Sequence, residues 1–260
     1  CIRDRPTVLF CPEDLLILKT GASARRRFGD NALCQLRPNY DGALTEYNRI
    51  LEQKSRLLKD GRDNPSVLEI LPEYNARLCR VGAILISYRA RFYQALGQAA
   101  GEYHRQFSGG KEEFRLDYRT VSTVTDPFAP VATLEGQLQD HLHSHYRGEL
   151  DSAQCLTGPH KDDFEISLSG INLKLYGSQG QTRTAAISLK LAQRELMRRE
   201  WGQEPVLLLD DVLSELDAGR QDFVLNQIVH GQVFITCCDP GRFTKLGKTM
   251  EIQDGFLVTH

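Results

Sequence analysis

The chain has 260 residues, of which 41% are hydrophobic and 25% are charged, and its formal net charge is −2. This composition is typical of a globular protein with a hydrophobic core, and it excludes a disordered tail, a collagen-like rod and a disulfide-rich miniprotein. No hydrophobic run approaches the roughly 18 residues that a membrane span needs, and no hydrophobic signal segment follows Arg3 and Arg5. The seven cysteines form no C-x-x-C pair, so we expect reduced thiols in a soluble, cytoplasmic protein.

The first predicted elements are a short strand and two long helices. The β-rich run 6–10 predicts a strand, which ends at Cys11 and Pro12. Hydrophobic residues recur at spacings of three and four over 22–59 and again over 67–107, with Gly61, Asn64 and Pro65 between the two stretches. This pattern predicts two helices that pack as an antiparallel hairpin. A plain helical lobe without a further role is an open alternative.

Strands and helices alternate in the second half of the chain. We expect a strand over 114–119, a helix over 131–149, strands over 164–168 and 173–175 around a turn at Ser169 and Gly170, a helix over 180–200, a strand over 205–210, a helix over 215–229, a strand over 232–236 and a hairpin over 248–259. The alternation predicts an α/β fold with a mixed sheet core. We therefore expect a first core segment at 1–18, an inserted helical lobe (lobe II) at 19–110 and a second core segment at 111–260.

Two adjacent carboxylates, Asp210 and Asp211, follow the fully hydrophobic run 206–209. A parallel strand of this kind is buried on both faces, and its carboxyl end opens into the crevice where α/β proteins bind ligands. One carboxylate there can hold Mg²⁺ while the other orients a water molecule for phosphoryl transfer. The alternative is a strand that runs into a helix start capped by Asp211 or Ser214.

Three further segments have the residue types of a phosphate site. Gly177, Ser178, Gln179, Gly180 and Gln181 precede a predicted helix, whose N-terminal N–H groups and dipole favour an anion such as a γ-phosphate. The run 214–217, which ends at Asp217, follows the carboxylates; it could equally be a capping segment with Ser214 as N-cap. Thr236 ends the next hydrophobic strand, where its hydroxyl could contact the same phosphate.

In this order, the motifs resemble the signature, Walker B and D-loop of ABC-type ATPases of the SMC and Rad50 kind. The residues of these motifs resemble those of the RecF family of bacterial recombination mediators more closely still. The matching segments are FCPEDL at 10–15, ARRRF at 24–28, GPHKDD at 158–163, GSQGQ at 177–181 and LDDVLSELD at 209–217. They extend over nearly the whole chain.

The resemblance implies an ABC-type ATPase head that uses ATP and Mg²⁺. Asp210 would be the Mg²⁺-associated Walker B carboxylate, and Asp211 would orient or deprotonate the attacking water. The signature of one copy would reach the γ-phosphate of ATP held by a second copy, in an ATP-dependent head-to-head homodimer. The nucleotide-binding set would be Ser178, Gln179, Gly180, Gln181, Asp217 and Thr236.

The sequence departs from the family pattern at four places. No glutamine follows the strand at the Q-loop place near Glu13, Cys237 stands where a switch histidine is expected, and Lys161 replaces an arginine of the GPHKDD segment. The P-loop pattern G-x-x-x-x-G-K-[ST] occurs nowhere in the 260 residues. We therefore expect the chain by itself neither to bind ATP tightly nor to hydrolyse it.

A basic cluster indicates a DNA contact. Residues 19–60 contain nine Lys or Arg against five acids, and Arg25, Arg26 and Arg27 are the densest part. Such residues give salt-dependent, sequence-independent DNA affinity, although a solvated basic helix face would look the same. The resemblance implies binding at single-strand and duplex junctions, recombinase loading in recombinational repair and SOS induction, and the partners RecR and RecO.

Three competing interpretations are weighed against this one. A non-catalytic SMC-like head or DNA-binding structural module stays open. A transporter ATPase is disfavoured by the long, basic helical insertion and by the residues GSQGQ at 177–181. His141, His143 and His145 could suggest zinc, but a helix turns side chains at i and i+2 about 200° apart, so we expect no metal there.

Overall fold

The computed structural model describes residues 6–238, 247–253 and 256–258, so Cys1, Arg3, Arg5 and the end of the predicted hairpin lie outside it. The helices are α1 Ala22–Leu36, α2 Pro38–Asp60, α3 Leu71–Ser108, α4 Val131–Ser152, α5 Leu173–Tyr176, α6 Gln179–Trp201 and α7 Ala218–Gln227, and the strands are β1 Thr7–Phe10, β2 Phe114–Arg119, β3 Asp163–Leu168, β4 Ile171–Asn172, β5 Val206–Asp210, β6 Val233–Thr236, β7 Glu251–Gln253 and β8 Phe256–Val258. Most of the expected elements are therefore present.

The strand predicted at 6–10 pairs with the hydrophobic strand that ends in the carboxylates. The sheet order is β1-β5-β6 and both pairings are parallel, with Phe10 opposite Leu209 and Asp210 opposite Thr236. Phe10 and Leu209 are buried in the core cluster to which α6 also contributes. Because the strands are parallel, their carboxyl ends meet at one edge of the sheet.

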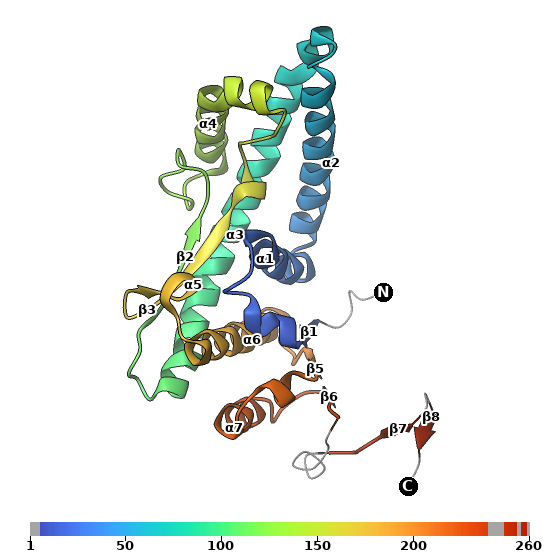
Figure 1. Cartoon of the computed structure of the whole chain (residues 1–260), viewed down its shortest axis with the longest axis vertical. Coiled ribbons are helices and arrows are strands. Elements are labelled where there is room, and N and C mark those ends of the chain that lie inside the picture. The colour runs from blue at the N-terminus through green and yellow to red at the C-terminus, as the bar shows by residue number, and fades with distance from the viewer. Residues whose placement is uncertain (1–5, 239–246, 254–255, 259–260) are drawn as a thin grey trace.

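A second, antiparallel sheet has the order β2-β3-β4 and packs along α3 (Figure 1). The strand expected over 173–175 is wrong: this segment is the short helix α5. The Asn172 side chain accepts hydrogen bonds from the N–H groups of Lys174 and Leu175, and an asparagine that satisfies these first free N–H groups starts a helix.

Helix α3 is the long axis of the molecule, and α2 and α4 pack along its upper half in Figure 1. The helix expected over 22–59 is two helices, because Arg37 is extended and Pro38 starts α2 at its first position. Helix α4 packs on α3 through Leu134, Leu138 and Leu142. The segment 131–152 thus joins the helical layer, although the expected boundary at 110 placed it in the core segment.

The segment after Asp211 also differs from expectation. A single 3-10 turn, η5 Val212–Glu215, precedes α7, and Asp217 is the N-cap of α7, because its Oδ1 accepts a hydrogen bond from the Arg220 N–H at 3.0 Å. Ser214 is not the cap; its hydroxyl donates to the Asp211 carbonyl at 2.6 Å. The C-terminal hairpin is confirmed by the antiparallel pair β7 and β8. In the part of the chain that the structure describes, no helix combines the length and the hydrophobicity that a bilayer crossing requires.

Candidate functional site

The carboxyl edge of the parallel sheet brings together three residues that the sequence singled out. The Thr236 hydroxyl donates to Asp210 Oδ1 at 2.7 Å and accepts from the Asp211 N–H at 3.0 Å. The same Asp211 N–H lies 3.2 Å from the Thr236 carbonyl. Thr236 therefore fixes both carboxylate-bearing residues from the neighbouring strand.

Asp211 has an unusual backbone and an unsatisfied side chain. Its φ is +50°, in the left-handed region that residues other than glycine rarely adopt. Its Oδ1 is buried and has no hydrogen-bond partner among the described residues. A buried acceptor without a donor costs about 1–3 kcal/mol, and backbone strain concentrates at functional sites. This oxygen is therefore a place where a water molecule or a ligand would be stabilised.

The signature segment forms a capping box at the start of α6. Ser178 is the N-cap: its Oγ accepts from the Gln181 N–H at 3.2 Å, and Gln181 Oε1 accepts from the Ser178 N–H at 3.1 Å. Such a reciprocal pair is a capping box. Ser178 and Gln179 are exposed, and Gly180 and Gln181 are half-buried. The positive end of α6 is thus presented at the surface.

A chain of polar contacts ties this segment to the long helix α3. The Gln181 amide donates to Glu112 Oε1 at 2.8 Å, and Glu112 Oε2 lies 2.9 Å from His104 Nε2. His104 is 0% exposed. The hydrogen bond from Gln181 and, less strongly, the contact with His104 lower the pKa of Glu112. The signature is therefore coupled to the helical layer by Glu112, a residue that the sequence did not single out.

Asp217 and the signature are joined by Arg220, which sequence analysis also missed. The Arg220 guanidinium pairs with Asp217 and donates to the Gly180 carbonyl at 3.1 Å and to Thr184 Oγ1 at 3.2 Å. The hydrogen bond from the Arg220 N–H, together with its side chain, lowers the pKa of Asp217. The only sequence signal was the spacing of three from a helix-capping acid.

The exit of β1 lies against α6. Asp14 Oδ2 accepts from the Cys11 N–H at 3.0 Å and pairs with Lys190 of α6 at 3.0 Å. Glu13, at the place where a Q-loop was expected, is exposed in the 3-10 turn η2 Pro12–Leu16. Lys190, rather than a glutamine, therefore connects this turn to the signature helix.

The expected DNA contact at Arg25 is wrong in this structure. Arg25 is 1% exposed. Its Nε and Nη2 donate to the two carboxylate oxygens of Asp163 at 2.6 and 2.8 Å, and its Nη1 donates to the carbonyls of Ile17 and Thr20 at 3.1 and 2.7 Å. A guanidinium with these partners holds α1 to β3 and is not available to a phosphate.

The neighbours of Arg25 differ in exposure. Arg26 is half-buried and donates to the Asp162 carbonyl at 2.8 Å, whereas Arg27 is exposed. Another basic residue of the run, Lys54, has its partner inside the fold: it pairs with Glu149 at 2.5 Å, and both side chains are 0% exposed. Part of the local positive charge is thus paired with acids inside the fold, and Arg27 is the member of the cluster that faces solvent.

The GPHKDD segment is a buried polar junction. Asp162 is 1% exposed and pairs with Arg89 of α3 at 2.8 Å, and Arg89 also pairs with Asp30 of α1 at 2.9 Å. His160 Nδ1 lies 2.7 Å from the Tyr47 hydroxyl. Burial lowers the pKa of His160 to about 4, and the charge of Lys161 acts in the same direction. These contacts join the helical layer to the antiparallel sheet.

The three histidines of α4 lie on a helix, as predicted. The rings of His141 and His145 stack with centroids 4.0 Å apart, and His141 Nδ1 lies 2.8 Å from the Thr157 hydroxyl. Within the described ranges, no three His, Cys, Asp or Glu residues gather into a metal-binding group. The side-chain oxygens of Asp210, Asp211 and Thr236 are ligands of the kind that Mg²⁺ prefers.

Comparisons with known proteins find similar sequences over most of the chain. No family model matches the chain. It is 39% identical over 236 residues to the DNA replication and repair protein RecF of Acetivibrio thermocellus, which covers 91% of this chain and 64% of the relative. It is 40% identical over 238 residues to RecF of Agathobacter rectalis, covering 92% of this chain and 63% of the relative.

Solved structures show the same fold. The recombination mediator protein RecF in a structure described as RecF-ATPrS in the RecFOR pathway matches with a TM-score of 0.86 and 28% identity, over 98% of this chain and 67% of that one. A structure described as RecF-ATP matches with a TM-score of 0.85 and 31% identity, over 97% and 66%. The expected α/β ATPase-head fold is confirmed. The chain spans about 64% of the length of its curated relatives, and over that part it is similar to the DNA replication and repair proteins named RecF.

Proposed function

We propose that the chain is the signature- and Walker B-bearing part of an ATP-dependent DNA-binding protein of recombinational repair. The observation that carries the proposal is the edge formed by Asp210, Asp211 and Thr236, in which one threonine positions two adjacent carboxylates. Solved relatives described as RecF-ATP and RecF-ATPrS support a nucleotide at this fold.

Asp210 and Asp211 have separate roles in this proposal. Asp210 is exposed at the strand end and suits Mg²⁺, which proteins bind through one or two carboxylates together with substrate phosphates. When bound, Mg²⁺ neutralises phosphate charge. Asp211 accepts or orients the proton of the attacking water, and its unpartnered Oδ1 is consistent with that role.

The signature acts on a nucleotide held by a second copy. Ser178 and Gln179 are exposed at the start of α6, so their side chains and the free N–H groups there can reach a γ-phosphate across a homodimer interface. Gln181 and Asp217 support them from within the fold through Glu112 and Arg220. ATP would close the homodimer and hydrolysis would open it.

The residues proposed to contact DNA are two of the three arginines of the basic cluster. Arg26 and Arg27 remain candidates for phosphate contacts, and Arg25 is replaced by its structural role. We propose that the protein binds at single-strand and duplex junctions and loads recombinase in SOS-linked repair. We further propose that its partners are RecR and RecO and that it is located in the cytoplasm. Residues 19–110 together with α4 would form the helical lobe that contacts DNA.

The test is ATP turnover by a protein of the relatives' full length, with and without DNA. We expect DNA to stimulate turnover and Asp211→Asn to abolish it while an ATP-held dimer persists. Asp140→Asn, an exposed aspartate of α4, is the matched control. Turnover that is absent from the unsubstituted protein under all conditions would favour a non-catalytic head instead.

A further inference from the structure

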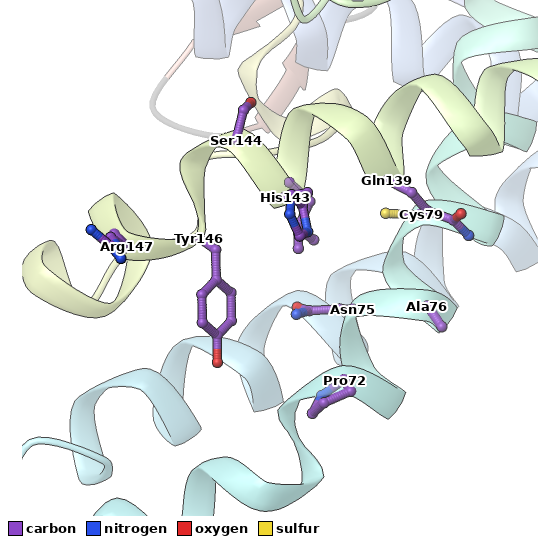
Figure 2. A pocket seen from close by; sticks show the side chains of 10 residues that line it. Pro72, Asn75, Ala76, Cys79, Gln139, His143, Ser144, Tyr146 and Arg147 are labelled. Carbon is purple, nitrogen blue, oxygen red and sulfur yellow. The ribbon is translucent and has the colours of Figure 1, made fainter.

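A cavity of about 680 Å³ lies between the start of α3 and the second half of α4. The cavity is lined by α3 and α4 of the helical layer. The Walker B and signature residues lie at the end of β5 and at the start of α6 instead (Figure 1). Figure 2 shows His143, Tyr146 and Arg147 on α4 across from Pro72 and Asn75 on α3. Pockets of drug-sized ligands have volumes of about 300–1,000 Å³, so the cavity can hold a small molecule.

Asn75 gives the cavity a specific chemical requirement. Its side chain is 9% exposed and lines the space between the two helices (Figure 2), and its Oδ1 is buried without a hydrogen-bond partner in the described residues. Buried carboxamide oxygens are nearly always satisfied, because an unpaired one carries its full desolvation penalty. A ligand with an N–H donor would supply the missing partner.

The remaining walls add a flat hydrophobic surface and positive charge. Tyr146 is 37% exposed, so one part of its ring is accessible to a planar group. Arg147 is exposed beside it, Gln139 adds a second carboxamide, and none of the residues that line the cavity is acidic. Aromatic rings stack on nucleobases, carboxamides pair with base edges and arginine pairs with phosphate.

We propose that this cavity binds a single nucleotide. The base stacks on Tyr146 and donates an N–H to Asn75 Oδ1, and the phosphate pairs with Arg147. The ligand is either a free nucleotide or an unpaired nucleotide of a DNA strand, and the second source rests on the proposed function. An acidic peptide would also be attracted to Arg147, but the two carboxamides and the aromatic ring favour a base.

The first experiment is calorimetric titration of the 260-residue chain with dAMP and with deoxyribose 5-phosphate. We expect saturable binding of dAMP and at least tenfold weaker binding of the sugar phosphate. Asn75→Leu, which keeps the branching and the number of side-chain heavy atoms, and Arg147→Gln should each weaken dAMP binding about tenfold. Arg105→Gln, an exposed arginine near the other end of α3, is the matched control and should leave it unchanged.

The second experiment identifies the source of the nucleotide. Displacement of dAMP by a duplex with a single-stranded overhang, but not by a blunt duplex, supports a DNA strand; displacement by neither supports a free nucleotide. The inference is overturned if dAMP does not bind, if both cavity variants bind it unchanged while still folded, or if only an acidic peptide binds. ATP turnover and its loss in Asp211→Asn are measured separately, so failure of the proposed function would be distinguishable.

Discussion

Replacing Arg25 by methionine tests whether this arginine of the basic cluster is a structural residue. Methionine keeps the length of the aliphatic stem and removes the guanidinium, which makes four hydrogen bonds between α1, the β1 exit and β3. The change leaves the Asp163 carboxylate and the carbonyls of Ile17 and Thr20 without their donors. Its effect should therefore be on folding, before any effect on DNA.

The magnitude follows from the burial of the pair. Removing one partner of a buried ion pair costs about 3–5 kcal/mol. The Arg25 side chain is 2% exposed but that of Asp163 is 25% exposed, so water partly replaces the lost donor. We therefore expect the lower end, a loss of about 3 kcal/mol in the free energy of unfolding.

Urea denaturation of the 260-residue chain, followed by circular dichroism, measures this loss. Arg27→Met is the matched control: it removes an exposed arginine from the same helix and should change the free energy of unfolding by less than about 0.5 kcal/mol. A loss below about 1 kcal/mol for Arg25→Met, or equal losses for the two variants, would refute the reasoning.

Four further predictions concern His160, the cap of α6, the exposed Arg27 and the affinity for ATP. Because the pKa of His160 falls from 6.5 unfolded to about 4 folded, its contribution to stability is complete above pH 6.5 and is lost as the pH falls towards 4; His160→Gln should remove about 3 kcal/mol of that pH dependence in urea titrations. Ser178→Ala should cost about 1 kcal/mol of unfolding free energy by removing the cap of α6, and an unchanged midpoint would contradict the capping role. Arg27→Glu in the full-length protein should weaken DNA binding and flatten its salt dependence, and an identical slope would argue against a phosphate contact. The Arg147→Gln variant of the 260-residue chain, in which the cavity between α3 and α4 is weakened, should show no micromolar affinity for ATP by calorimetry, because the chain contains no P-loop motif.

The parts of the fold that could be predicted are those with local signals. The hydrophobic run that ends at Asp210 predicts a buried strand, whereas its parallel pairing with Thr7–Phe10 was not predicted, because the two strands are about 200 residues apart in sequence. The break at Pro38 was missed because the hydrophobic spacing continues across it. Over 173–175, two leucines in alternation suggested a strand, but the Asn172 cap makes the segment helical.

The candidate site was predictable in its residue types and not in its connections. The motif order places Asp210, Asp211 and Thr236 at the ends of two strands, and the hydrogen bonds among them show that they lie close together. Burial of Arg25 depends on Asp163, 138 residues away in sequence, and no local pattern encodes a contact of that kind. Glu112 escaped notice for the same reason, since the amide of Gln181 that it binds is 69 residues away.

The most direct measurement of the central claim is complementation between two inactive full-length variants. In a homodimer whose sites each combine the carboxylates of one copy with the signature of the other, Ser178→Arg and Asp211→Asn are each inactive alone. An equal mixture should recover about a quarter of the unsubstituted ATP turnover, because half of the dimers are mixed and each of these has one intact site. A mixture no more active than either variant alone would contradict the account.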